Sequence, residues 1–153
     1  MSGTKKRFIL LIAAAAFFVG CGQDTTLHSI SGQVTLAGIP RERLLVYFRP
    51  IDKVVNAYNL GVGETDKTGR LTLRSTAGDG LVKGKYRVTF SYGLTKINGQ
   101  EIALPTDRKE ESSSVVSVEQ VPEKYTDSEQ SPVEFEVVAG GENRLEFDIP
   151  GKL

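Results

Sequence analysis

The chain has 153 residues, enough for one domain, with 19 basic and 19 acidic residues. This balance argues against a nucleic-acid partner, which favours a basic face. A single cysteine rules out an internal disulfide. A single histidine, His28, is too few for a zinc site, and no nucleophile motif accompanies it. The acidic residues lack the spacing of an EF-hand. We therefore expect no metal, no cofactor and no enzymatic activity.

The first 21 residues have the order of a secretory signal peptide. Basic residues 5–7 precede an unbroken apolar run over 8–19, and Gly20 then places a small residue before Cys21. The apolar run is too short for a membrane span, which needs about 20 residues. The cleavage edge resembles a bacterial lipobox, with Phe18 where leucine is usual. We therefore expect cleavage between Gly20 and Cys21, followed by acylation of Cys21.

This cleavage divides the chain into a signal peptide (1–20), a lipidated cysteine with a polar tether (21–28) and a domain (29–150). Three basic residues leave with the signal peptide, so the mature chain is net negative. Two acyl chains hold a protein stably on a bilayer, because each buried methylene contributes about 0.8 kcal/mol. Membrane lipid is thus the first expected partner. In enteric bacteria an aspartate after the cysteine signals inner-membrane retention, so Gly22 favours the outer membrane if the cell has two.

From residue 29 onward, apolar and polar residues alternate with the period of two that predicts β-strands. Seven such segments, separated by turn signals, indicate an antiparallel β-sandwich. We expect the strands, in chain order, at residues 30–36, 44–48, 58–62, 71–73, 86–92, 133–137 and 145–149. The second segment is apolar on both faces and should form a central strand. In the third, Tyr58, Leu60 and Val62 form the apolar set.

Two hairpins are expected between these strands. Asp66-Lys67-Thr68-Gly69 has the aspartate and the glycine of a type I turn, and it should join the third and fourth strands. Residues 140–143 should join the last two strands. Acidic side chains on that hairpin and basic side chains on the middle strands are interpreted as ordinary solvated faces. The alternative is a polarised surface that docks a partner or an envelope polymer.

The stretch 93–121 departs from the alternating pattern. It contains a charged run and three consecutive serines, and loops of this length in compact domains are either functional or disordered. Two interpretations stay open. One is a mobile surface loop, with Pro122 and Tyr125 fixing its end to the sandwich. The other is a binding loop, in which Tyr92 or Tyr125 offers an aromatic platform for a ligand.

Four motifs resemble those of small bacterial lipoproteins with a carboxypeptidase regulatory-like, or transthyretin-like, domain. Residues 31–40 match an opening SGxVTLxGxP, and residues 65–73 match a TDxxGxFxL hairpin with Leu71 in the aromatic slot. Residues 84–88 match GxYxV, and residues 121–131 resemble IPxKYxDxxxS, with Val121 at the isoleucine position. The resemblance covers nearly the whole mature domain. It implies a seven-stranded antiparallel Greek-key β-sandwich that serves as a non-catalytic module.

Transthyretin-like folds include hydroxyisourate hydrolases, but their several histidines and Tyr-Arg-Gly-Ser-type tail are absent from this chain. We therefore expect a membrane-anchored lipoprotein of the cell envelope that acts as a structural or protein-interaction module. The alternative is an accessory protein that binds a carbohydrate or small ligand through residues 93–121. The partner would then be an envelope protein in the first case and an envelope polysaccharide or small ligand in the second.

Overall fold

The computed structural model of the chain describes residues 24–97, 100–103 and 117–151. The expected signal peptide, with Gly20 and Cys21, lies outside these residues. Within them strands dominate, and the only helix is the single turn α1 (Glu123–Thr126). The expected all-β class is therefore confirmed.

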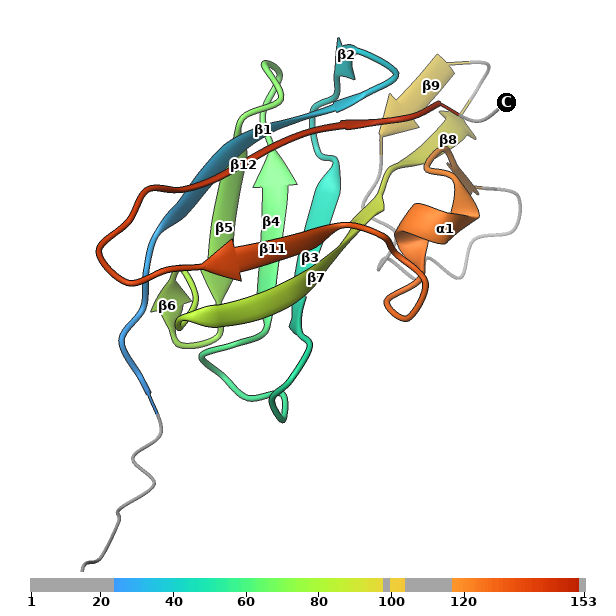
Figure 1. Ribbon diagram of the computed structural model, residues 1–153. Coiled ribbons are helices and arrows are strands. Elements are labelled where there is room, and N and C mark those ends of the chain that lie inside the picture. Colours follow the sequence, from blue (N-terminus) through green and yellow to red (C-terminus); the bar gives the residue numbers. More distant parts are fainter. Residues whose placement is uncertain (1–23, 98–99, 104–116, 152–153) are drawn as a thin grey trace, which may run out of the picture.

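The described strands form three sheets. The largest is antiparallel and runs in the order β11 (Glu134–Val137), β7 (Gly84–Ser91), β3 (Leu45–Pro50), β4 (Gly61–Thr65), β5 (Leu71–Ser75) and β6 (Gly78–Asp79). A second sheet, in the order β12 (Asn143–Ile149), β1 (Ile30–Leu36) and β2 (Ile39–Pro40), lies across one face of the first (Figure 1). The third has the order β10 (Ser117–Glu119), β8 (Gly93–Ile97) and β9 (Gln100–Ala103).

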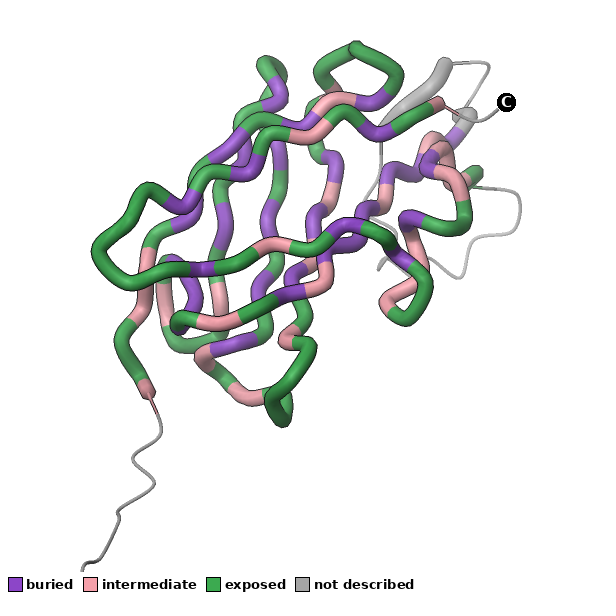
Figure 2. Tube along the Cα trace, viewed as in Figure 1, coloured by how far each residue is buried: buried purple, intermediate pink, exposed green. Residues whose placement is uncertain are grey.

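The hydrophobic core fills the space between the two larger sheets, as in a β-sandwich. Alternate residues of the strands point into it, and they appear as purple segments in Figure 2. Its fully buried members include Val34, Val46, Phe48, Val88 and Ile149. Phe90 of β7 stacks on Phe147 of β12 with the ring centroids 5.3 Å apart. This aromatic pair joins one sheet to the other across the core.

Most of the expected strands are found where the alternating pattern placed them. Strands β1, β3, β5, β7, β11 and β12 coincide with expected segments to within a few residues. β3 lies between β7 and β4, which confirms the expected central strand. The β4–β5 hairpin is also confirmed. Its turn is held by the Asp66 carboxylate, which accepts hydrogen bonds from the backbone N–H groups of Thr68 (2.7 Å) and Arg70 (3.0 Å).

The expected hairpin between the last two strands is wrong. β11 pairs with β7 and β12 pairs with β1, so the two strands belong to different sheets. The buried Asn143 amide makes the corner between them. Its Oδ1 accepts from the N–H of Val138 (2.8 Å) and its Nδ2 donates to the Val138 carbonyl (3.1 Å). The side chain thus replaces a strand partner for Val138.

The β1–β12 pairing also departs from the expected all-antiparallel arrangement. These two strands are parallel, from Ile30 opposite Asn143 to Leu36 opposite Ile149. At the end of the pair, the Asp148 carboxylate accepts hydrogen bonds from the Thr35 hydroxyl (2.6 Å) and the Gly38 N–H (2.7 Å). These bonds lower the pKa of Asp148.

The third expected strand is shifted along the chain and inverted. β4 begins at Gly61, and its inward positions are Gly61, Gly63 and Thr65, whereas Leu60 and Val62 are exposed. The two glycines are needed because the side chains of Leu71 in β5 and of Leu81 in the β6–β7 connection fill the space on that face. A Cβ at Gly61 would lie 3.0 Å from a methyl group of Leu81, and one at Gly63 would overlap Leu71.

Residues 93–121 are not one uninterrupted loop. β8, β9 and β10 lie within this stretch and pair with one another, while residues 104–116 lie outside the described part of the chain. The Glu119 carboxylate fixes the returning end by accepting hydrogen bonds from the Ser91 hydroxyl (2.6 Å) and the N–H groups of Tyr92 (2.9 Å) and Val121 (2.8 Å). The weak alternation of this stretch concealed its strands.

Gly32 provides the first test of the fold. A Cβ at this position would overlap the backbone carbonyl of Leu145 on β12, and a backbone atom cannot move aside as a flexible side chain can. We expect Gly32→Ala to lower the free energy of unfolding by about 3 kcal/mol or more, measured by urea denaturation. Ser31→Ala, at the exposed neighbouring position, should change it by less than about 0.5 kcal/mol. Equal stabilities of the two variants would contradict the close approach of β1 and β12.

Candidate functional site

The two tyrosines proposed as a ligand platform are both buried. Tyr92 and Tyr125 are each 7% exposed. The ring of Tyr125 lies against Phe147, with centroids 5.9 Å apart, and the Arg41 guanidinium carbon lies 5.8 Å from the centroid of Tyr92. Each ring therefore packs against the protein itself. Gly20 and Cys21, the expected cleavage and lipidation residues, lie outside the described residues.

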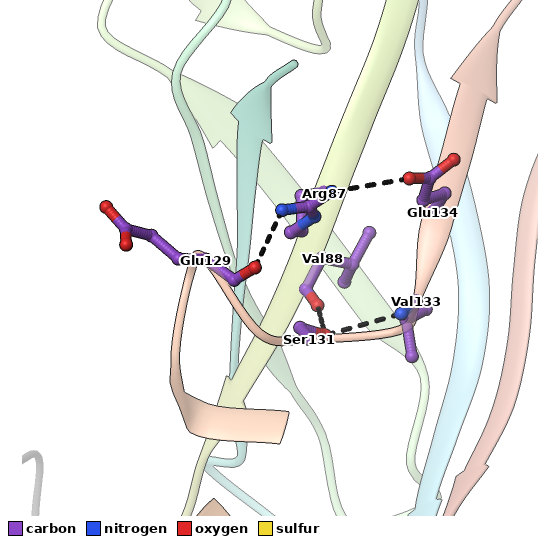
Figure 3. A network of polar contacts seen from close by, with 6 residues as sticks. All are labelled: Arg87, Val88, Glu129, Ser131, Val133 and Glu134. Atoms are coloured by element: carbon purple, nitrogen blue, oxygen red, sulfur yellow. Dashed lines mark hydrogen bonds and ion pairs between the residues drawn. The ribbon is translucent and has the colours of Figure 1, made fainter. Parts of the chain in front are cut away.

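The segment that resembles IPxKYxDxxxS folds as a structural clasp against β7. Tyr125 fills the core from α1, and the Asp127 carboxylate accepts a hydrogen bond from the N–H of Glu129 (2.7 Å). The Ser131 hydroxyl donates to the Val88 carbonyl (2.5 Å) and accepts from the N–H of Val133 (3.4 Å), as Figure 3 shows. The expectation that Tyr125 fixes the end of this stretch to the sandwich agrees with its burial.

The guanidinium group of Arg87 also binds the segment over residues 121–131. Its Nη1 donates to the Glu129 carbonyl (2.9 Å), and its Nη2 lies 3.4 Å from Glu134 Oε1 (Figure 3). Arg49 is its neighbour across the strands, and it donates to the Ser128 hydroxyl at 3.4 Å. The two guanidinium groups line a shallow hollow of about 360 Å³. Both guanidinium groups thus contact the segment that precedes β11, Arg87 at Glu129 and Arg49 at Ser128.

Tyr86 is fully enclosed by the protein, hydroxyl included. It is 1% exposed, and its hydroxyl donates to the carbonyl of Val82 at 2.6 Å. Gly84, with φ of 153°, allows the chain to fold back between the two residues. A tyrosine near the start of a strand that bonds the backbone a few residues upstream is a tyrosine corner. Burial raises the pKa of Tyr86 to about 12.

The described end of the tether is attached to the domain. His28 and Leu81 exchange backbone hydrogen bonds of 2.8 and 3.1 Å, and Lys83 Nζ lies 3.5 Å from Asp24 Oδ2. A Cβ at Gly80 would overlap the His28 carbonyl, so this glycine is what lets the tether approach. The sole histidine is thus used through its backbone. The spacing of residues gave no sign of this attachment.

The described part of the chain holds neither a cluster of metal-binding side chains nor a membrane-spanning helix. Nowhere in residues 24–97, 100–103 and 117–151 do three or more His, Cys, Asp or Glu side chains come together in a way that would hold a metal ion. The same residues include no helix with the length and hydropathy that a bilayer crossing requires. No protein-family model, curated protein or solved structure matches this chain.

Ser131 tests the clasp. Ser131→Ala leaves the buried carbonyl of Val88 without the hydroxyl that it accepts from, so we expect the free energy of unfolding to fall by about 1–3 kcal/mol. Ser128→Ala, which removes only the long contact to Arg49, should cost less than about 0.5 kcal/mol. Urea denaturation of both variants measures the difference. A Ser131→Ala protein as stable as the wild type would show that the clasp does not hold the segment.

Tyr86 predicts a loss of stability in alkali. An unfolded tyrosine releases its proton near pH 10.0, whereas the folded chain holds it to about pH 12. The folded state therefore binds more protons in this window, and stability that is fully present below pH 10.0 falls as the pH rises toward 12. We expect Tyr86→Phe to be less stable by about 1 kcal/mol at neutral pH and to lose less stability in alkali. Parallel pH profiles of wild type and variant, measured by urea denaturation, would contradict this.

Proposed function

We propose that this chain is a membrane-anchored bacterial lipoprotein of the cell envelope, acylated at Cys21 after removal of residues 1–20. Its β-domain would be a non-enzymatic structural or protein-interaction module. The observation that carries the proposal is the order of the leader: basic residues 5–7, an apolar run, Gly20 and then the only cysteine of the chain. A lone cysteine at this position fits acylation, because no second cysteine exists for it to pair with.

The attachment of the tether is compatible with this proposal. Asp24 is ion-paired to Lys83 and His28 is bonded to Leu81, so the chain joins the domain only a few residues after Cys21. A lipid on Cys21 would therefore hold the domain close to the bilayer. Gly22, in place of aspartate, favours the outer membrane in a cell with two membranes.

We also propose the finer fold that the resemblance implies, a Greek-key, transthyretin-like sandwich. The tyrosine corner at Tyr86 supports it, because this feature is a hallmark of immunoglobulin-type Greek-key sandwiches. Three residues of the motifs that carry the resemblance also have structural roles. Gly32 allows the close approach of β12, Asp66 stabilises a turn, and Ser131 binds the clasp to β7. The parallel β1–β12 pair is the departure from an all-antiparallel version of this fold.

The alternative function, a carbohydrate- or small-ligand-binding accessory, gains no support from the positions of Tyr92 and Tyr125. A sugar-binding platform needs an exposed aromatic face, and both rings are buried. Residues 104–116 lie outside the described part of the chain. We therefore retain the structural or protein-interaction module as the proposed function.

Cys21 tests the membrane anchoring. Cys21→Ser removes the sulfur that would carry the diacylglycerol, so the protein should move from the membrane fraction to the soluble fraction and lose incorporation of labelled palmitate. Gly22→Ala is the matched control, because it leaves the cysteine in place and should stay in the membrane fraction. A Cys21→Ser protein that remains with the membrane as fully as the wild type would refute the lipidation.

A further inference from the structure

An exposed apolar loop lies at the end of the domain where the tether is attached. The loop joins β3 to β4 and carries Ile51, Val54 and Val55, which are 36%, 88% and 39% exposed. In Figure 1 it lies at the lower end of the molecule, as does the start of the described chain at Asp24. A valine that is almost completely exposed at a loop tip gains nothing from the fold. It is a candidate for contact with an apolar surface.

The loop and the tether share one connected set of contacts. Lys53 Nζ donates to the carbonyl of Lys83 at 2.9 Å, and the Lys83 ammonium is the ion-pair partner of Asp24. The N–H of Ile51 donates to the carbonyl of Lys85 at 3.0 Å. The tether, the connection before β7 and the β3–β4 loop are therefore neighbours in space, although they come from three parts of the sequence.

The shape of the loop is fixed by a buried asparagine. Asn59 is 1% exposed, its Nδ2 donates to the carbonyl of Val54 at 2.9 Å, and its Oδ1 accepts from the N–H of Asn56 at 2.7 Å. The Asn56 side chain in turn accepts from the N–H of Tyr58 at 2.9 Å. These bonds hold the backbone at Val54 in a defined position, so the outward side chain is displayed by a formed turn.

The length of the tether limits how far this end can lie from a lipid on Cys21. An extended chain spans at most about 3.6 Å per residue, so Asp24 lies within about 11 Å of Cys21 and His28 within about 25 Å. Ile39 in β2 lies beyond the far end of β1, which at about 3.3 Å per residue is about 20 Å long. In Figure 1, β2 is at the opposite end of the molecule from the start of the described chain. The tether end is therefore the end of the domain that a lipid on Cys21 would keep nearer to the bilayer.

From these contacts we propose that the β3–β4 loop, with Val54 at its tip, is a membrane-contact surface that enters the headgroup region of the bilayer. This proposal rests on the proposed lipidation of Cys21. Apolar contact carries it, because the nearby charges balance. Lys53, Lys83 and Lys85 are matched by Asp24, by Asp52 in the loop and by Glu136 opposite Lys85. The contact should therefore form on zwitterionic and on anionic lipid alike. Lysines flanking an apolar tip can keep their ammonium groups at the headgroup level.

The chain has no tryptophan, so single-tryptophan variants report position without interference. Val54→Trp places the reporter at the loop tip, and Ile39→Trp, at a side chain that is 50% exposed, is the matched control at the opposite end. Each variant, like the wild type, is expressed with its leader and purified in detergent from whole cells. It is then reconstituted into vesicles of phosphatidylcholine, with or without phosphatidylglycerol, in which the lipids are brominated near the glycerol end of the acyl chains.

We expect bromine to quench the tryptophan of Val54→Trp at least about threefold more than that of Ile39→Trp, in both kinds of vesicle, because an interfacial segment reaches the acyl boundary. Vesicle flotation separates the two proposals. If the wild type does not float with the vesicles, the lipidation fails and the membrane-contact surface fails with it. If the protein floats but the two tryptophans are quenched equally, or Ile39→Trp more strongly, only the membrane-contact surface is wrong. The loop would then face water or a protein partner.

Discussion

Strands β1 and β12, the first and last described strands in the sequence, lie side by side in parallel. Their pairing runs from Ile30 opposite Asn143 to Leu36 opposite Ile149. The second layer of the sandwich depends on this pair, because β2 adds only two residues to it. Without the pair, the apolar face of the six-stranded sheet would lose its cover, and Phe147 would lose its contact with Phe90. Gly32 makes the pairing possible, since any side chain there would meet the backbone of β12.

Local features of this fold follow from the sequence because they depend on neighbouring residues. The alternating pattern located six of the strands, and the turn at Asp66 correctly predicted the β4–β5 hairpin. At β4 the alternating pattern predicted the wrong core-facing residues, because a glycine counts in it as neither apolar nor polar. Gly61 and Gly63 face the core, where Leu81 in the β6–β7 connection and Leu71 in β5 supply the missing volume. Both leucines lie outside residues 58–65, so no pattern within that segment contains this information.

Strand partners and buried polar groups were the other features that sequence reasoning missed. The alternating pattern predicted a hairpin between the last two strands. In the structure, the Asn143 amide binds the backbone of Val138 at a corner, and β12 pairs in the other sheet. Asn59 organises the β3–β4 loop in a comparable way. An asparagine in a polar stretch gives no sign in the sequence that it will be buried. The attachment of His28 to Leu81 also could not be predicted from the sequence, because it uses only backbone atoms.

The candidate functional features divide along the same line. The leader with Gly20 and Cys21 is recognisable in the sequence, whereas the surface that would face a membrane appears only once the loop, the tether and Lys83 are seen together. The central claim is that the mature chain begins with an acylated Cys21. Intact-mass spectrometry of the wild-type protein, extracted from its native membrane, tests this most directly. We predict the mass of residues 21–153 increased by a diacylglycerol-type modification on the first residue. An unmodified chain, or one that begins at another residue, would contradict the account.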